Sequence, residues 1–333
     1  MALAGAPQYN SESLVINPVY SGLVQTLTPK SFNLAHNDIF PVHSFTSNGN
    51  GQGFYRRYSM ADTLRDIDFD ALTNRGLGKA DALSRATYVE TFRTRRRKLD
   101  VVVNEDEAKL LQAQGLMDPH MSEIAWEKEL MLLAKERKAA KIAAQNSNFG
   151  YAGAPAYAWS DFVNSDPVAD ISDARVTVRN ACGRVPNVLT LPWEVALLLS
   201  RHPKIKNLRG YTERSIITAA GFVELFKACF NFDDVIVFES MYNASRPSVA
   251  GTLSLTSVWG KHAMVFYRPP TQSLEEMVWG LDIHDKFYNG DFQNGVYAIP
   301  DLDNEVVKYR IKEDSEINIL NKELALAIRN VMP

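Results

Sequence analysis

The chain has 333 residues, of which 46% are hydrophobic and 23% are charged, and its formal net charge is −3. A chain of this length and composition can bury a core without covalent cross-links, and more than one lobe is expected. The slightly acidic balance argues against a dedicated nucleic-acid binder, which needs a basic surface to displace counterions. The two cysteines, Cys182 and Cys229, have no metal-ligand spacing, so neither a disulfide framework nor a zinc site is expected.

The first 46 residues are polar and irregular, and we interpret them as an extended arm that neighbouring structure must order. Met1–Asn10 lacks a basic start followed by an apolar stretch, so no secretory signal is expected. The most apolar run, Val188–Leu199, is interrupted by Pro192 and Glu194 and is too short to span a bilayer. The sequence therefore predicts a soluble protein that folds in the cytoplasm.

Residues 47–103 begin with a glycine-rich turn, Ser47–Gly53, and then alternate between polar and apolar residues. This pattern predicts a long two-stranded excursion with a loose tip near Gly76 and Gly78. Because an isolated hairpin is only marginally stable in water, we expect this one to lie against another surface, such as another subunit.

The strongest charge feature of the sequence lies on this excursion. It consists of seven basic residues: Arg56, Arg57, Arg93, Arg95, Arg96, Arg97 and Lys98. Three interpretations are open: contact between subunits, contact with nucleic acid, and a solvated strand end. The negative net charge and the absence of interleaved aromatic residues favour contact between subunits and rank nucleic acid last.

Residues 118–145 give the clearest helical pattern, and Ser122 is a candidate N-cap. Apolar residues at helical spacing form one narrow stripe: Trp126, Leu130, Leu133, Ala134, Ala140 and Ala144. The remaining positions are rich in Glu, Lys and Arg. Such a helix suits a strut that lies across a sheet on its apolar stripe.

The second half of the chain alternates between helical and strand patterns. Residues 146–158 are interpreted as a linker, and Pro192 is well placed to begin a helix that runs to His202. Strands are expected at 235–238, 257–267 and 277–283, and again from residue 306 onward.

Motifs that carry catalytic chemistry are not found. The nearest phosphate-loop candidate has Ala80 after Gly78-Lys79 and Thr73 in place of its first glycine, and neither GxSxG nor HExxH occurs. Asp66, Asp68 and Asp70 lack the glycine and glutamate that a calcium loop requires. The six histidines are not at metal-ligand spacing. We therefore expect no catalytic, cofactor-binding or metal-binding residues, and no enzyme.

A set of short motifs resembles the major capsid proteins of tailed bacteriophages. These motifs occur in order as Trp159-Ser-Asp161, Ser165-Asp-Pro-Val-Ala-Asp-Ile171, Gly183-Arg-Val-Pro-Asn187 and His202-Pro-Lys-Ile205. Further along the chain, Asp234–Asn243 resembles the family's strand followed by a Tyr-Asn turn, and Trp259-Gly260 opens a strand that ends in Phe266-Tyr-Arg-Pro269.

The resemblance implies an α+β fold of the Hong Kong 97 type. It implies an N-terminal arm at 1–46, an extended E-loop hairpin at 47–103, and a peripheral domain at 104–186 whose spine helix is the helix near 118–145. It further implies an axial domain at 187–254 and a return to the peripheral domain at 255–333, with some axial segments.

The implied function is a structural capsid subunit that self-assembles into hexamers and pentamers of an icosahedral shell around packaged double-stranded DNA. The implied partners are further copies of the chain and a portal. Since the sequence shows no long helical pre-segment, the resemblance implies either a separate scaffolding protein or a chain that is already processed. The implied location is the virion, after assembly in the host cytoplasm. Two alternatives stay open: an encapsulin-like shell that stores a cargo enzyme, and a soluble two-lobed enzyme.

Overall fold

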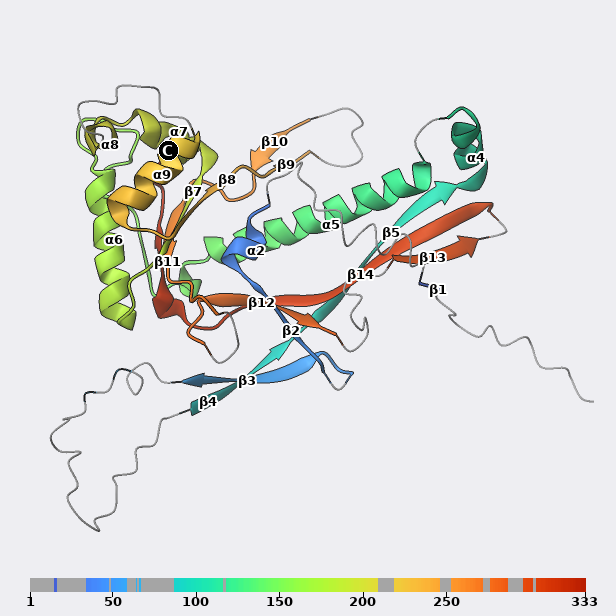
Figure 1. Ribbon diagram of the computed structural model, residues 1–333, viewed down its shortest axis with the longest axis horizontal. Helices are drawn as coiled ribbons and strands as arrows, with labels where there is room; N and C mark the ends of the chain where they lie inside the picture. Colours follow the sequence, from blue (N-terminus) through green and yellow to red (C-terminus); the bar gives the residue numbers. More distant parts are fainter. Residues whose placement is uncertain are drawn as a thin grey trace, which may run out of the picture.

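The structure is a computed structural model that describes residues 15–16, 34–47, 49–58, 64, 66, 87–115, 118–208, 219–245, 253–271, 276–286, 296–301 and 304–333. These residues form two separate main sheets, and one long helix, α5, runs from the end near α4 toward the group of helices α6–α9 (Figure 1). The expected α+β class is confirmed. No helix within the described ranges is long and apolar enough to cross a membrane.

The larger sheet has six strands in the order β1-β13-β14-β12-β2, and β5 also pairs with β14. Its strands are β1 (Val15–Ile16), β2 (Val42–Phe45), β5 (Arg95–Asn104), β12 (Gly280–Asp285), β13 (Val296–Asp301) and β14 (Val306–Ile319). The long strand β14 organises the sheet, because Val306–Ser315 pair with β5 while Ser315–Ile319 pair with β12. A helical turn, α2 (His36–Ile39), precedes β2.

The predicted strut helix is confirmed as α5 (Pro119–Ala144), which follows the shorter α4 (Glu105–Ala113). Asp118, and not Ser122, is its N-cap: the Asp118 side chain accepts a hydrogen bond from the backbone N–H of His120, and Pro119 occupies the first turn.

The expected orientation of α5 is wrong. Trp126 and Leu130 point to solvent, whereas Ile124 and Met131 pack on the sheet together with the charged residues Glu127 and Lys128. These charged side chains have polar partners on the sheet, because Glu127 accepts a hydrogen bond from the backbone N–H of Ile311 and Lys128 lies within the electrostatic reach of Glu313.

The smaller sheet has five strands in the order β6-β15-β11-β7-β8. These strands are β6 (Tyr151–Gly153), β7 (Val188–Pro192), β8 (Asp234–Phe238), β11 (Ala263–Phe266) and β15 (Ala325–Ile328). Four helices gather around it: α6 (Pro167–Cys182), α7 (Trp193–Arg201), α8 (Pro203–Leu208) and α9 (Ala219–Phe230) (Figure 1). Their apolar side chains form one core with the sheet, centred on Trp159, Leu189, Leu199 and Phe226.

The smaller sheet shows where several elements predicted from the sequence begin and end. The helix expected from Pro192 to His202 is confirmed as α7, with Pro192 as its N-cap residue. The expected strand 257–267 is in fact two strands, β10 (Leu255–Ser257) and β11, which belong to different sheets and are separated by a turn at Gly260 with φ of 67°. The interpreted linker 146–158 contains the edge strand β6. The strand β10 pairs with β9 (Met241–Asn243).

The two-stranded excursion is confirmed as an antiparallel pair of β3 (Gln52–Tyr58) and β4 (Thr87–Arg93). The pair ends at Arg93, earlier than expected. Thr94 lies between β4 and β5, and its N–H and hydroxyl both bond the carbonyl of Gly51. Residues 95–104 then continue into the six-stranded sheet as β5. The expected loose tip near Gly76 and Gly78, and the acidic stretch after Asp66, lie outside the described residues.

Candidate assembly interface

A buried ionic cluster fixes α5 to the six-stranded sheet. We call Lys135, Asp282, His284 and Glu313 the Lys135 cluster. The ammonium of Lys135 pairs with the carboxylate of Asp282, lies 2.7 Å from Oε1 of Glu313, and lies 3.0 Å from Nε2 of His284. Burial disfavours the charged ammonium, but Glu313 and Asp282 outweigh burial and raise the pKa of Lys135.

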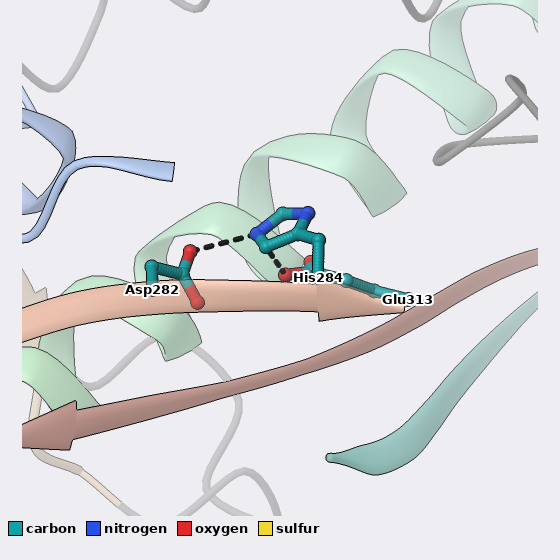
Figure 2. Close-up of side chains that lie close together, drawn as sticks. All are labelled: Asp282, His284 and Glu313. Atoms are coloured by element: carbon teal, nitrogen blue, oxygen red, sulfur yellow. Dashed lines mark hydrogen bonds and ion pairs between the residues drawn. The ribbon is translucent and has the colours of Figure 1, made fainter. Parts of the chain in front are cut away.

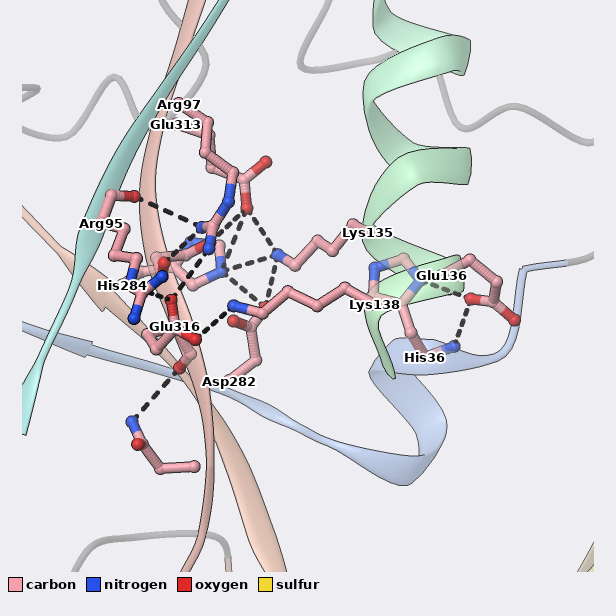
Figure 3. Close-up of polar contacts among 12 residues, drawn as sticks. His36, Arg95, Arg97, Lys135, Glu136, Lys138, Asp282, His284, Glu313 and Glu316 are labelled. Atoms are coloured by element: carbon pink, nitrogen blue, oxygen red, sulfur yellow. Dashed lines mark hydrogen bonds and ion pairs between the residues drawn. The ribbon is translucent and has the colours of Figure 1, made fainter. Parts of the chain in front are cut away.

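The three sheet residues of this cluster have the composition of a metal site. One ligand atom from each of Asp282, His284 and Glu313 lies within 4.8 Å of the others (Figure 2). Lys135 reaches the same atoms from α5 and supplies the positive charge that a cation would bring (Figure 3). The cluster is therefore explained as a helix-to-sheet connection, and we assign no metal to it.

The ionic network continues outward to the basic run that the sequence singled out. Arg97 bonds the carbonyl of Ser315 and lies 2.8 Å from Oε2 of Glu316, which Lys138 of α5 also contacts (Figure 3). Arg96 lies 3.4 Å from Asp314. These two arginines therefore pair within their own chain.

The seven basic residues differ in exposure and in whether they have an intrachain partner. Arg57 on β3 pairs with Glu90 of β4 at 3.5 Å, so it joins Arg96 and Arg97 as a residue with an intrachain partner. The exposed side chains are Arg56 on β3, Arg93 on β4, and Arg95, Arg96 and Lys98 on β5, and Arg95 also lies 3.9 Å from Glu316. The structure thus brings the run to the base of the hairpin and leaves only part of it open to a partner.

The hairpin itself has one packed face and one exposed apolar face. Tyr55 and Phe92 pack against Leu281 and Ile283 of the six-stranded sheet. Gly53 is required here, because a Cβ at this position would lie 2.2 Å from the Phe92 ring. On the opposite face, Phe54 is 71% exposed. Val89 of β4 lies on the same face and is 63% exposed, and exposed apolar side chains that lie together on an extension are typical of a surface that another protein covers.

A second polar centre attaches the N-terminal segment to α5. Glu136 is fully buried and accepts hydrogen bonds from the backbone N–H groups of Ala35 and His36, from the His36 ring at 2.7 Å, and from the Trp259 indole at 2.5 Å. Burial opposes ionisation, but these donors stabilise the carboxylate and lower its pKa. Glu136 therefore fixes the beginning of α2 against the middle of the long helix.

A buried serine–histidine pair, Ser165 and His202, has the residue types of a catalytic centre. Ser165 Oγ lies 3.0 Å from Nε2 of His202. The backbone N–H of Lys204 donates to Nδ1 of the same ring, so the ring proton is on Nε2 and donates to Ser165. The serine hydroxyl in turn donates to the carbonyl of Asp161 at 2.5 Å. His202 cannot take the serine proton in this arrangement, so the pair is structural.

Sequence reasoning missed the residues of both polar centres on α5. Each one depends on contacts between residues about 100 to 180 positions apart, such as His36 with Glu136 and Lys135 with Glu313. The available signal was the high number of charged residues outside the apolar stripe of the helix.

Two comparisons with known proteins find sequences or structures similar to this chain. No protein-family profile matches the sequence. The major capsid protein of Burkholderia phage BcepMu is 28% identical over 146 residues, which are 42% of this chain and 44% of that protein. The chain thus matches less than half the length of this curated relative.

Solved structures match nearly the whole fold. A phage-related protein from Bordetella bronchiseptica RB50 is 17% identical with a TM-score of 0.70, covering 97% of this chain and 99% of that one. The capsid structure of cyanophage P-SCSP1u is 8% identical with a TM-score of 0.53, covering 91% and 89%. The chain therefore has the Hong Kong 97-type capsid fold. Its sequence is related to that of a phage major capsid protein, and the resemblance is confirmed.

Proposed function

We propose that the chain is the structural major capsid protein of a tailed phage. In this proposal it assembles into hexamers and pentamers of an icosahedral shell around packaged double-stranded DNA. The observation that carries the proposal is the exposed apolar face of the β3–β4 hairpin on a capsid fold. An extension with Phe54 in solvent is unfavourable for a monomer and suits a subunit whose neighbours cover it.

Closed shells derive their stability from many modest contacts that are repeated over a lattice. The hairpin, the N-terminal segment held by Glu136 and the exposed basic residues Arg56, Arg93, Arg95 and Lys98 supply such contacts. In this proposal the hairpin is the E-loop, α5 is the spine helix of the peripheral domain and the five-stranded sheet lies in the axial domain. The partners are further copies of the chain, a scaffolding protein and a portal, and the location is the virion after assembly in the host cytoplasm.

The test is electron microscopy of the purified chain, expressed alone and together with a scaffolding protein from the same phage. Closed shells, rings or tubes of regular subunits are expected. Nuclease-protected double-stranded DNA in particles from infected cells supports a phage capsid, whereas a co-purifying cargo enzyme without DNA supports an encapsulin-like shell. Uniform monomers under every salt and partner condition would contradict both.

A further inference from the structure

The outward face of α5 has the heptad pattern of a helix-pairing surface. Glu123, Trp126, Leu130, Leu133 and Arg137 follow one another at alternating steps of three and four residues, which is the spacing of a coiled-coil seam. Trp126 is 53% exposed and Leu130 is 37% exposed.

The inward side of the same helix buries charged residues beside Ile124 and Met131. Glu127 lies against the six-stranded sheet, whereas Glu136 lies against α2 and Trp259. Glu127, Lys128 and Glu136 are each less than 10% exposed. A helix that buries charges and presents Trp and Leu to solvent has the reverse of the usual surface pattern, which indicates that its outward face has a partner.

This face is complementary to itself when two copies of α5 run antiparallel. Pairing Leu130 with Leu133 of the second copy places Trp126 opposite Arg137 of the second copy. The same alignment brings Glu123 beside Lys141 of the second copy, because the two residues lie at nearly equal distances from the centre. One register therefore gives an apolar centre, two cation–π contacts and two ion pairs.

Arg137, which would contact Trp126 of the second copy, is already held in place within the single chain. The Arg137 guanidinium lies over the Tyr242 ring of β9, 4.1 Å from its centroid, and the side chain stays exposed. In Figure 1 β9 and β10 lie beside the part of α5 nearer its C-terminal end, and α4 lies beside its N-terminal end. Tyr242 thus reduces the conformational freedom that Arg137 would lose on pairing.

We propose that the outward face of α5, formed by Glu123, Trp126, Leu130, Leu133, Arg137 and Lys141, is a two-fold contact between two copies of this chain. The inference rests on the proposed shell function. Head-to-tail contacts close subunits into rings, and neighbouring rings can then be joined by contacts in which the same patch meets itself. The self-complementary charges of α5 fit the second kind of contact, and they favour a second copy over a different protein.

Charge reversal tests the antiparallel register. Glu123→Lys and Lys141→Glu each place like charges together across the two-fold contact, and each single variant is expected to lower the yield of closed shells about tenfold, since a tenfold change requires only about 1.4 kcal/mol. The double variant Glu123→Lys/Lys141→Glu restores opposite charges and is expected to recover the yield. Glu107→Lys on α4, an exposed reversal away from this face, is the matched control.

Cysteine cross-linking tests the contact directly. Chains carrying Leu130→Cys and chains carrying Leu133→Cys, both with the exposed Cys229 replaced by Ser, are expected to give disulfide-linked dimers when they are assembled together into shells. Cys182 is buried and does not interfere. Ser172→Cys on the exposed side of α6 is the control that is expected to stay monomeric on a non-reducing gel.

The outcomes separate this inference from the proposed function. Shells that form normally from both single reversals, without cross-linking at Leu130 and Leu133, overturn the α5 contact and leave the capsid function standing. Single reversals that fail and are not rescued by the double variant show that something other than a second copy occupies the face, which also overturns the inference. Failure of the unmodified chain to assemble under any condition contradicts the proposed function itself.

Discussion

Lys135 of α5 and Glu313 of β14 form an ion pair of 2.7 Å in which the two side chains are 10% and 6% exposed. The pair connects the long helix to the longest strand, and Asp282 provides a second carboxylate for the same ammonium. Removing one charge from such a pair leaves the others buried without compensation, which costs far more than the loss of a surface ion pair.

Replacement of Lys135 by Met is therefore expected to destabilise the subunit by about 3–5 kcal/mol, because Asp282 and Glu313 then lose their cation. Urea unfolding followed by circular dichroism measures the change. Lys141→Met, at an exposed position of the same helix, is the control and is expected to stay within about 0.5 kcal/mol of the natural chain. Equal stabilities for the two variants would show that the Lys135 cluster does not hold α5 in place.

Glu127 makes stability dependent on pH. It is almost completely buried, and burial raises its pKa to about 8, although a hydrogen bond from the N–H of Ile311 opposes the shift. In the unfolded chain the same carboxyl ionises near its ordinary pKa of 4.5. Between these two values the folded state binds more protons, so stability falls as the pH rises from 4.5 toward 8.

Glu127→Gln is expected to remove this dependence. The variant should be more stable than the natural chain at neutral pH, and the difference should grow as the pH is raised from about 5.5 to about 8, where the raised pKa is reached. Melting temperatures across this range measure the effect. A constant difference between the two proteins at every pH would mean that Glu127 is already ionised in the folded state.

The bounds of α5 could be predicted from sequence, whereas its orientation could not. Asp118-Pro119 marks its beginning, and the Lys- and Glu-rich pattern continues to its end. The apolar stripe through Trp126 and Leu130 looks the same whether it faces a core or a partner. The buried face was hidden because the partners of Lys135 are about 150 to 180 residues away in sequence.

Two further differences between the prediction from sequence and the structure have local physical reasons. The 16-residue helix α6 was not predicted as a unit, although Asp166 caps it, Pro167 begins it and Gly183 ends it with φ of 67°. The basic run was expected to lie wholly on the two-stranded excursion, but the chain leaves the hairpin at the buried Thr94, and Arg95–Lys98 belong to another sheet. The capsid fold itself followed from the motif order between Trp159 and Pro269 and could not have been derived from periodicity alone.

Substitutions of Phe54 and Phe92 on the hairpin are expected to have opposite effects: one impairs assembly and the other destabilises the subunit. Phe92→Ala removes a buried ring from the contact with the sheet and should cost about 3–5 kcal/mol of subunit stability. Phe54→Ser changes a side chain in solvent and should leave the free energy of unfolding within about 0.5 kcal/mol. The Phe54→Ser chain should nevertheless form fewer closed shells in electron micrographs, because the contact between Phe54 and the neighbouring subunit is removed. Normal shells from a well-folded Phe54→Ser chain would remove the hairpin face from the assembly interface.

The basic residues at the base of the hairpin allow the assembly role to be separated from folding. Arg97→Ala removes contacts to Glu316 and Ser315 and is expected to lower subunit stability by about 1 kcal/mol, as for a partly exposed pair. The triple variant Arg56→Ala/Arg93→Ala/Lys98→Ala changes exposed side chains and should leave the melting temperature nearly unchanged.

If these side chains contact a neighbouring subunit, the triple variant should need lower salt or higher protein concentration to assemble, because rim charges act mainly through long-range attraction that salt screens. Light scattering during assembly at two ionic strengths measures this. An unchanged salt dependence in the triple variant would assign the run to the internal ion pairs of Arg96 and Arg97 alone.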